Sequence, residues 1–148
     1  MPKVTRRALI DASPEEVFDV VADVEGFSRY SSCIKEVREA SPGVFVWRAE
    51  VLGITLTWEA VVTESTRPVR YAWASTGGVF NRGSYTIRPS GSPSGAKIEV
   101  TFEMEYRLAD SPLGEVLSPV LSPVISAVAG ELMERIEKEF IGRARKPS

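Results

Sequence analysis

The sequence of 148 residues contains no histidine and a single cysteine, Cys33. The absence of histidine excludes Ser-His-Asp triads and imidazole acid–base catalysis, and one cysteine cannot form a disulfide within the chain or a Cys/His zinc site. We therefore expect a protein without a bound metal or cofactor.

The sequence also lacks a large net charge and long hydrophobic runs. The net charge of −2 gives no basic excess for a polyanion, so we expect no nucleic acid partner. No apolar run approaches the roughly 18 residues that span a bilayer, and MPKVTRRALIDA lacks the pattern of a signal peptide. We expect a cytoplasmic location. A small basic tail, Arg143, Arg145 and Lys146, leaves peripheral membrane contact open.

The chain length of 148 residues supports a sizeable hydrophobic core, so we expect one globular domain over residues 1–148. Near the start, residues 3–11 read as a strand. Ser13 then stands before Pro14 and three residues ahead of Glu16, which is the pattern of a capping box. A short amphipathic helix is predicted from there, with a second helical segment before residue 34.

Strand-like segments with turn residues between them occupy the middle of the chain. They are predicted at 34–40, 44–52, 54–64, 69–75, 83–88 and 97–108. The last alternates most clearly, with Phe102 and Met104 on its apolar side and Glu99, Glu103 and Glu105 opposite. Short turns join antiparallel strands, so we expect one antiparallel sheet with a dry face and a wet face.

An amphipathic helix is predicted at the C-terminus. Apolar residues recur at helical spacing from Leu121 to Phe140, and Glu131–Arg135 and Glu134–Lys138 form favourable i,i+4 pairs. Because proline suits a first helical turn, we place the regular start near Ser122-Pro123, after a kink or a short helical turn at 113–121. The predicted fold is α+β: a curved antiparallel sheet of about seven strands around this long helix, with two short helices between the first two strands. This is a helix-grip arrangement.

In this element order and in three stretches, the chain resembles the START-like (SRPBCC) superfamily, particularly its polyketide cyclase/dehydrase and coenzyme Q-binding branch. The stretches are IDASPEEVFDVVADVEGFSRYSSCIKEV, GSYTIRP with GAKIEVTFEMEYRL, and ADSPLGEVLSP. Phe27 and Tyr30 match the two aromatic positions of the coenzyme Q-binding loop. Ser28, Ser32 and Cys33 depart from its prolines and tryptophan, which argues against quinone specifically.

The resemblance implies a cavity between sheet and helix that holds a small apolar molecule such as a lipid, a quinone or a polyketide. Its expected lining, with the first two residues at the mouth, is Phe27, Tyr30, Trp47, Trp58, Trp73, Tyr85, Phe102, Met104, Val124, Val128 and Leu132. The same pattern also fits a filled core, in which Phe27 and Tyr30 would plug the end rather than gate an opening.

Two further functions stay open at this stage. A metal-independent aromatase/cyclase would need polar residues in the cavity, for which the candidates are Tyr30, Asn81, Arg82 and Tyr85. Arg70 alternates with Tyr71 and Trp73 and should face outward. A lipid or cofactor chaperone would need a protein partner. We expect binding rather than catalysis, and the oligomeric state is not predicted.

Overall fold

The computed structural model describes residues 3–29, 31–89, 97–107 and 112–145, with the side chains of 123–142 in the last range. Within this part of the chain, seven strands form one antiparallel sheet in the order β1-β7-β6-β5-β4-β3-β2. The strands are β1 (Lys3–Ile10), β2 (Ile34–Ser41), β3 (Val44–Val51), β4 (Ile54–Thr66), β5 (Arg70–Gly78), β6 (Phe80–Pro89) and β7 (Ile98–Arg107).

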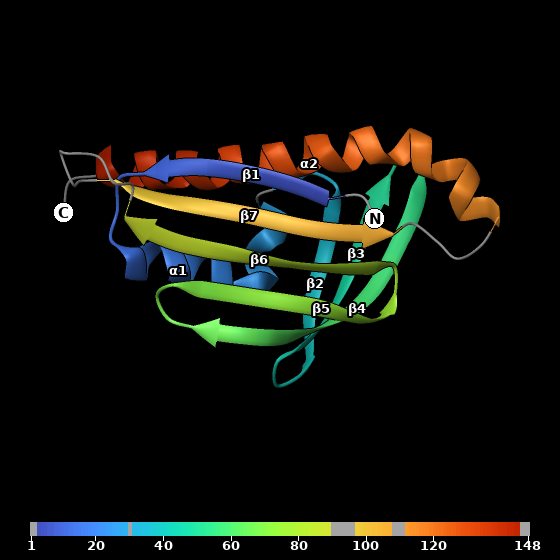
Figure 1. Cartoon of the computed structure of the whole chain (residues 1–148), viewed down its shortest axis with the longest axis horizontal. Coiled ribbons are helices and arrows are strands. Elements are labelled where there is room, and N and C mark those ends of the chain that lie inside the picture. The colour runs from blue at the N-terminus through green and yellow to red at the C-terminus, as the bar shows by residue number, and fades with distance from the viewer. Residues whose placement is uncertain (1–2, 30, 90–96, 108–111, 146–148) are drawn as a thin grey trace.

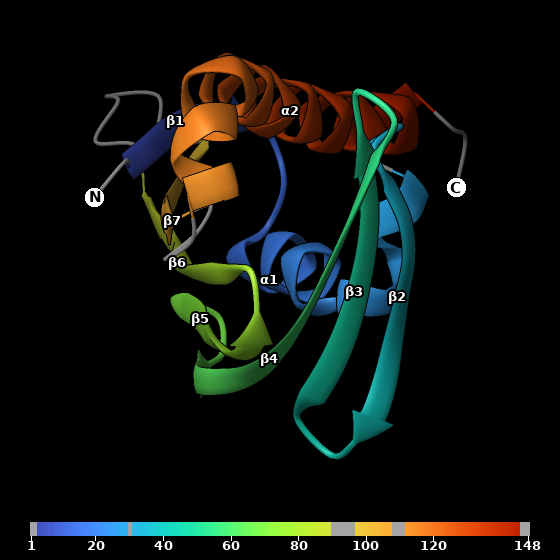
Figure 2. The same ribbon diagram turned by 90° about the vertical axis from the view of Figure 1, so that its right-hand side faces the viewer.

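The sheet curves into a trough that helix α2 (Pro112–Arg145) crosses lengthwise. Figure 1 shows α2 running alongside β1, and Figure 2, seen end-on, shows β2 and β3 standing opposite β6 and β7 beneath the helix. The buried core lies inside the trough, where β-strand side chains of one parity meet the apolar stripe of α2. Its fully buried members include Ile10, Val17, Tyr85, Val100 and Ile136.

Two short helices connect β1 to β2, as predicted. Helix α1 (Pro14–Ala22) lies on the inner side of the sheet, where Phe18 packs edge-on against Tyr71 of β5 with ring centroids 6.3 Å apart. The 3₁₀ helix η1 (Val24–Arg29) follows and buries Val24 and Phe27. The apolar faces of both helices turn toward the core, and the helices thereby close one end of the trough.

The predicted capping box starts α1. The backbone N–H of Glu16 donates to the Ser13 hydroxyl at 3.1 Å, and the Ser13 N–H donates to the Glu16 carboxylate at 3.3 Å. We expect Ser13→Ala to destabilise the protein by about 1 kcal/mol, because the Glu16 N–H loses its acceptor. Urea denaturation measures this loss. Glu16→Gln, which keeps an acceptor at the same place, should cost less; equal losses would contradict the reciprocal cap.

Helix α2 begins earlier than the sequence predicts. It starts at Pro112 and includes 113–121, whereas Ser122-Pro123 was the expected start. The prediction weighted Pro119 and Pro123 as helix breakers. Each proline removes one backbone donor but can remain within a helix that bends, and Figure 1 shows the first turns of α2 at an angle to the rest. The predicted ion pairs are present, Arg135–Glu131 at 4.0 Å and Lys138–Glu134 at 3.1 Å.

The observed architecture is the predicted helix-grip fold. Strand β6 is longer than the predicted 83–88, because Phe80 and Asn81 continue its pairing with Arg107 and Tyr106 of β7. Among the described helices, none combines the length and the apolarity that crossing a membrane requires.

Candidate functional site

A cavity of about 140 Å³ lies between the concave sheet and α2. Strands β2 to β7 supply most of its wall, η1 closes one side, and one stripe of α2 covers it. The lining residues are Val24, Phe27, Cys33, Ile34, Trp47, Ala49, Val51, Leu56, Trp58, Tyr71, Trp73, Val79, Asn81, Tyr85, Phe102, Met104, Tyr106, Ile125, Val128, Ala129 and Leu132. None of them carries a charge.

The polar side chain of Asn81 is already engaged within the wall. Its Oδ1 accepts a hydrogen bond from Trp73 Nε1 at 3.0 Å, and its Nδ2 donates to the Val79 carbonyl at 3.1 Å. Its backbone N–H donates to the Ser75 hydroxyl. Buried amides need such partners. Asn81 therefore fixes the orientation of the Trp73 indole, and its amide keeps one N–H donor and one oxygen lone pair beyond these two side-chain bonds.

Trp73 lies across a glycine of the neighbouring strand. Trp73 pairs with Gly83 of β6, and a Cβ added at Gly83 would lie 2.5 Å from the Trp73 Cζ2 atom. The indole also stacks on Phe102 at 6.0 Å and contacts Tyr85 at 5.7 Å. The absence of a side chain at Gly83 thus lets Trp73 lie close to the sheet, which keeps the space above it open.

Two tyrosines in the wall hold their protons more strongly than free tyrosine. Burial, together with the negative charge of Glu39, raises the pKa of Tyr71 to about 12. Burial and the nearby Tyr71 raise the pKa of Tyr85 well above its usual range, and the Tyr85 hydroxyl has no hydrogen-bond partner within the described residues. Both phenols are therefore neutral at physiological pH.

These shifts predict a loss of stability at alkaline pH. An unfolded tyrosine ionises near pH 10, whereas folded Tyr71 does so near pH 12, so the folded state binds more protons in between. The stabilising contribution is complete below about pH 10 and falls as the pH rises toward 12. We expect urea denaturation to show this decline, and Tyr71→Phe to show a shallower one. Identical declines in both proteins would contradict it.

The structure brings most of the predicted ligand-binding residues to the cavity. These are Phe27, Trp47, Trp58, Trp73, Tyr85, Phe102, Met104, Val128 and Leu132. Phe27 is buried in the wall, 4% exposed, and packs against Trp47 and Tyr85. Val124 is absent from the lining, and the adjacent Ile125 takes that place because it shares a helical stripe with Val128, Ala129 and Leu132. Tyr30 lies outside the described residues.

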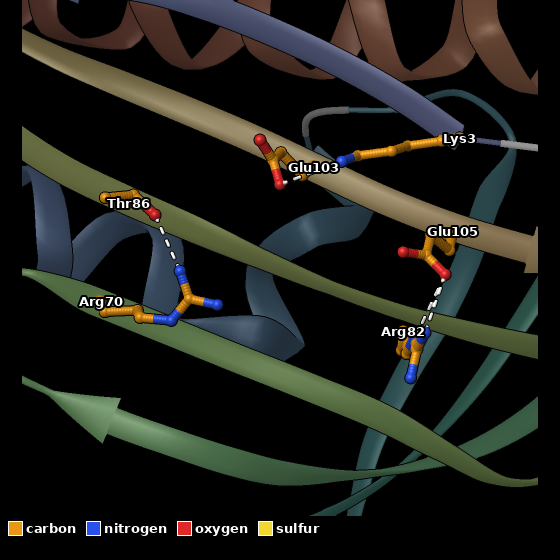
Figure 3. Close-up of polar contacts among 6 residues, drawn as sticks. All are labelled: Lys3, Arg70, Arg82, Thr86, Glu103 and Glu105. Atoms are coloured by element: carbon orange, nitrogen blue, oxygen red, sulfur yellow. Dashed lines mark hydrogen bonds and ion pairs between the residues drawn. The ribbon is translucent and has the colours of Figure 1, made fainter.

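Of the candidate catalytic residues, Arg82 lies away from the cavity. Its guanidinium pairs with Glu105 on the outer face of the sheet at 3.0 Å, as Figure 3 shows. Arg70 faces outward as predicted, bonded to Glu64 and to Thr86. Glu103 and Lys3 add a further pair on this face. Across the residues described, no group of three His, Cys, Asp or Glu side chains could hold a metal ion.

Several lining residues were not selected from the sequence. Tyr71 lies on the apolar side of its strand and Ile125 in the apolar stripe of the helix, so the sequence pattern predicts that both face inward. Val79 follows a glycine at a turn, where alternation gives no direction. Cys33 also borders the cavity, at the point where the chain enters β2.

Comparison with protein-family models matches residues 1–140 to the family described as "Polyketide cyclase / dehydrase and lipid transport". The chain belongs to this family. The match covers nearly the whole sequence, so the sheet, the short helices and all but the last residues of α2 lie within it. The resemblance to the START-like superfamily is thereby confirmed. A comparison with curated proteins found no match.

Solved structures show the same fold at low sequence identity. A Thermus thermophilus protein has 20% identity and a TM-score of 0.78, over 98% of this chain and 100% of that one. The Zhui aromatase/cyclase from Streptomyces has 18% identity and a TM-score of 0.73, over 97% and 96%. A START superfamily protein from Mycobacterium smegmatis has 17% identity and a TM-score of 0.67, over 92% and 97%. Identities this low establish the fold rather than the activity.

Proposed function

We propose that this family member binds a small apolar molecule in the cavity between the sheet and α2. The observation that carries the proposal is a partly open cavity of about 140 Å³ whose lining contains no charged side chain. Protein interiors are ordinarily filled to the density of organic crystals, so an apolar space of this size is a feature of the fold that needs a role.

The uncharged, mostly apolar wall of the cavity favours an uncharged, apolar ligand. A ligand charge placed here would lose its hydration without gaining an opposite charge, which is costly. A single-ring ligand buries roughly 200 Å² and gains about 5 kcal/mol at ~25 cal/mol/Å², from which several kcal/mol of association cost are subtracted. A compact ligand therefore binds weakly, and tighter binding needs a larger one that reaches beyond the cavity.

Binding agrees better with this geometry than a cyclase reaction does. An aromatase/cyclase needs side chains that stabilise an enolate and move protons in the cavity. Arg82 is paired with Glu105 outside it, and the neutral Asn81 amide is held in the wall by hydrogen bonds to Trp73 and Val79. Tyr85 is a neutral phenol, and no described residue forms a hydrogen bond with its hydroxyl, so it can donate a hydrogen bond to a ligand but has no base in contact with it in that part of the chain. We therefore favour carriage of a ligand over its conversion.

Native mass spectrometry of freshly purified protein tests the proposal. We expect a reproducible adduct that organic extraction identifies as an apolar molecule. Leu132→Trp, which places an indole in the cavity, should reduce the adduct in a protein that still unfolds cooperatively. A bare mass for the wild type, with no thermal shift from a panel of hydrocarbons, fatty acids and quinones, would contradict it.

A further inference from the structure

A row of three aromatic rings in contact, Phe27, Trp47 and Trp58, crosses one wall of the cavity. Trp47 on β3 pairs directly with Trp58 on β4, and their indoles stack with centroids 5.6 Å apart and planes 12° apart. Phe27 of η1 packs its ring against Trp47 at 5.8 Å and 62°. Directly paired residues of adjacent strands project from the same face of a sheet, so the row follows the wall from η1 to β4.

The row ends at Trp58. Among the described residues, Trp47 is the ring neighbour of Trp58, and the position that pairs with Trp58 on β5 is Gly78. Gly78 has a positive φ of 81°, and a Cβ there would collide with the Thr57 carbonyl oxygen. Strand β5 therefore cannot supply a side chain that covers Trp58 from this position. Trp58 is half-buried and borders the cavity.

From this arrangement we infer that the ligand carries a planar aromatic ring, which stacks on Trp58 and extends the row. The inference rests on the proposed binding function and adds the ligand class. Tryptophan offers a large π face, and aromatic pairs gain attraction beyond the burial of their area. A saturated ring of the same size gains the burial but not this attraction. The difference corresponds to a preference of about 2- to 10-fold for the aromatic ring.

Benzene and cyclohexane are a matched pair of probes. Both are small rings, and an apolar cavity of about 150 Å³ in another protein is known to hold benzene. Each is supplied to the full chain as vapour at equal fractions of saturation. The shift in melting temperature reports occupancy, and near-ultraviolet circular dichroism reports the environment of the tryptophans. We expect benzene to bind about 2- to 10-fold more tightly and to change the tryptophan signal.

Two variants assign the preference to Trp58. In Trp58→Leu, benzene and cyclohexane should bind equally, because the ring that stacks is gone. In Trp58→Phe, which restores an aromatic face, the preference should return. Cooperative unfolding of both variants shows that they retain the fold, and a preference that survives in Trp58→Leu would overturn the assignment.

The outcomes separate this inference from the function on which it rests. Equal binding of the two probes to the wild type would overturn the inference that the ligand is aromatic, while it would support an apolar binding cavity. Binding of neither probe would contradict both. Tighter binding of benzene that depends on an aromatic residue at position 58 would support both.

Discussion

Gly83→Ala is expected to destabilise the protein by about 3 kcal/mol, at the upper end of what overpacking usually costs. The new Cβ would lie 2.5 Å from the Glu103 carbonyl oxygen and 2.5 Å from Trp73 Cζ2, distances that real Cβ atoms do not occupy. Either β7 or the indole must move. Because Asn81 and Phe102 hold Trp73 from two sides, the adjustment would disturb the cavity wall as well.

Gly77→Ala is the matched control for this substitution. Gly77 lies on the neighbouring strand β5, and a Cβ there would meet no atom within 4 Å. Its effect on the free energy of unfolding should stay within about 0.5 kcal/mol. Equilibrium urea denaturation of the three proteins gives the comparison. Equal stabilities of the two variants would show that the space above Gly83 is not needed.

Val128→Phe is expected to lower the affinity for an apolar ligand by about tenfold or more. Val128 borders the cavity from α2, and a phenyl ring there would occupy the space that a ligand needs. Filling the space also gives the surrounding side chains new contacts, so stability should stay constant or rise by about 1 kcal/mol. Loss of binding without loss of stability is the expected result, measured by ligand titration and urea denaturation.

Ala127→Phe places the same ring on the exposed side of α2, one residue away. It should bind ligand like the wild type, because the cavity is unchanged. If Val128→Phe kept full affinity, the ligand would have to bind elsewhere. If it unfolded the protein, the region below α2 would be closely packed and would not contain the space described.

The fold could be predicted because its signals are local and repeated. Strict alternation identified the inward side of β7, including Phe102 and Met104, and the helical stripe identified Val128 and Leu132. The capping box fixed the start of α1. Each of these features depends on residues close together in the sequence, so periodicity and cap chemistry are sufficient to predict it.

The site was less predictable because it depends on contacts between distant segments. Arg82 faces outward because it pairs with Glu105 of β7 on the outer face of the sheet. It lies close to the end of its strand, where the alternation of apolar and polar residues does not predict which way a side chain points. The choice of Ile125 over Val124 depends on the rotation of α2 about its axis, which packing against β1 helps to set. The open space itself follows from sheet curvature and summed side-chain volumes, which alternation does not encode.

Methyl-detected NMR of the full chain titrated with benzene tests the central claim most directly. We expect chemical-shift changes at methyl groups that border the cavity, among them those of Val51, Leu56, Val128 and Leu132. The exposed apolar side chains Leu9, Leu52, Val69 and Ile141 provide internal controls, and their signals should stay in place. Shifts confined to these four exposed residues, with the cavity methyl groups unchanged, would contradict a ligand-binding cavity between the sheet and α2.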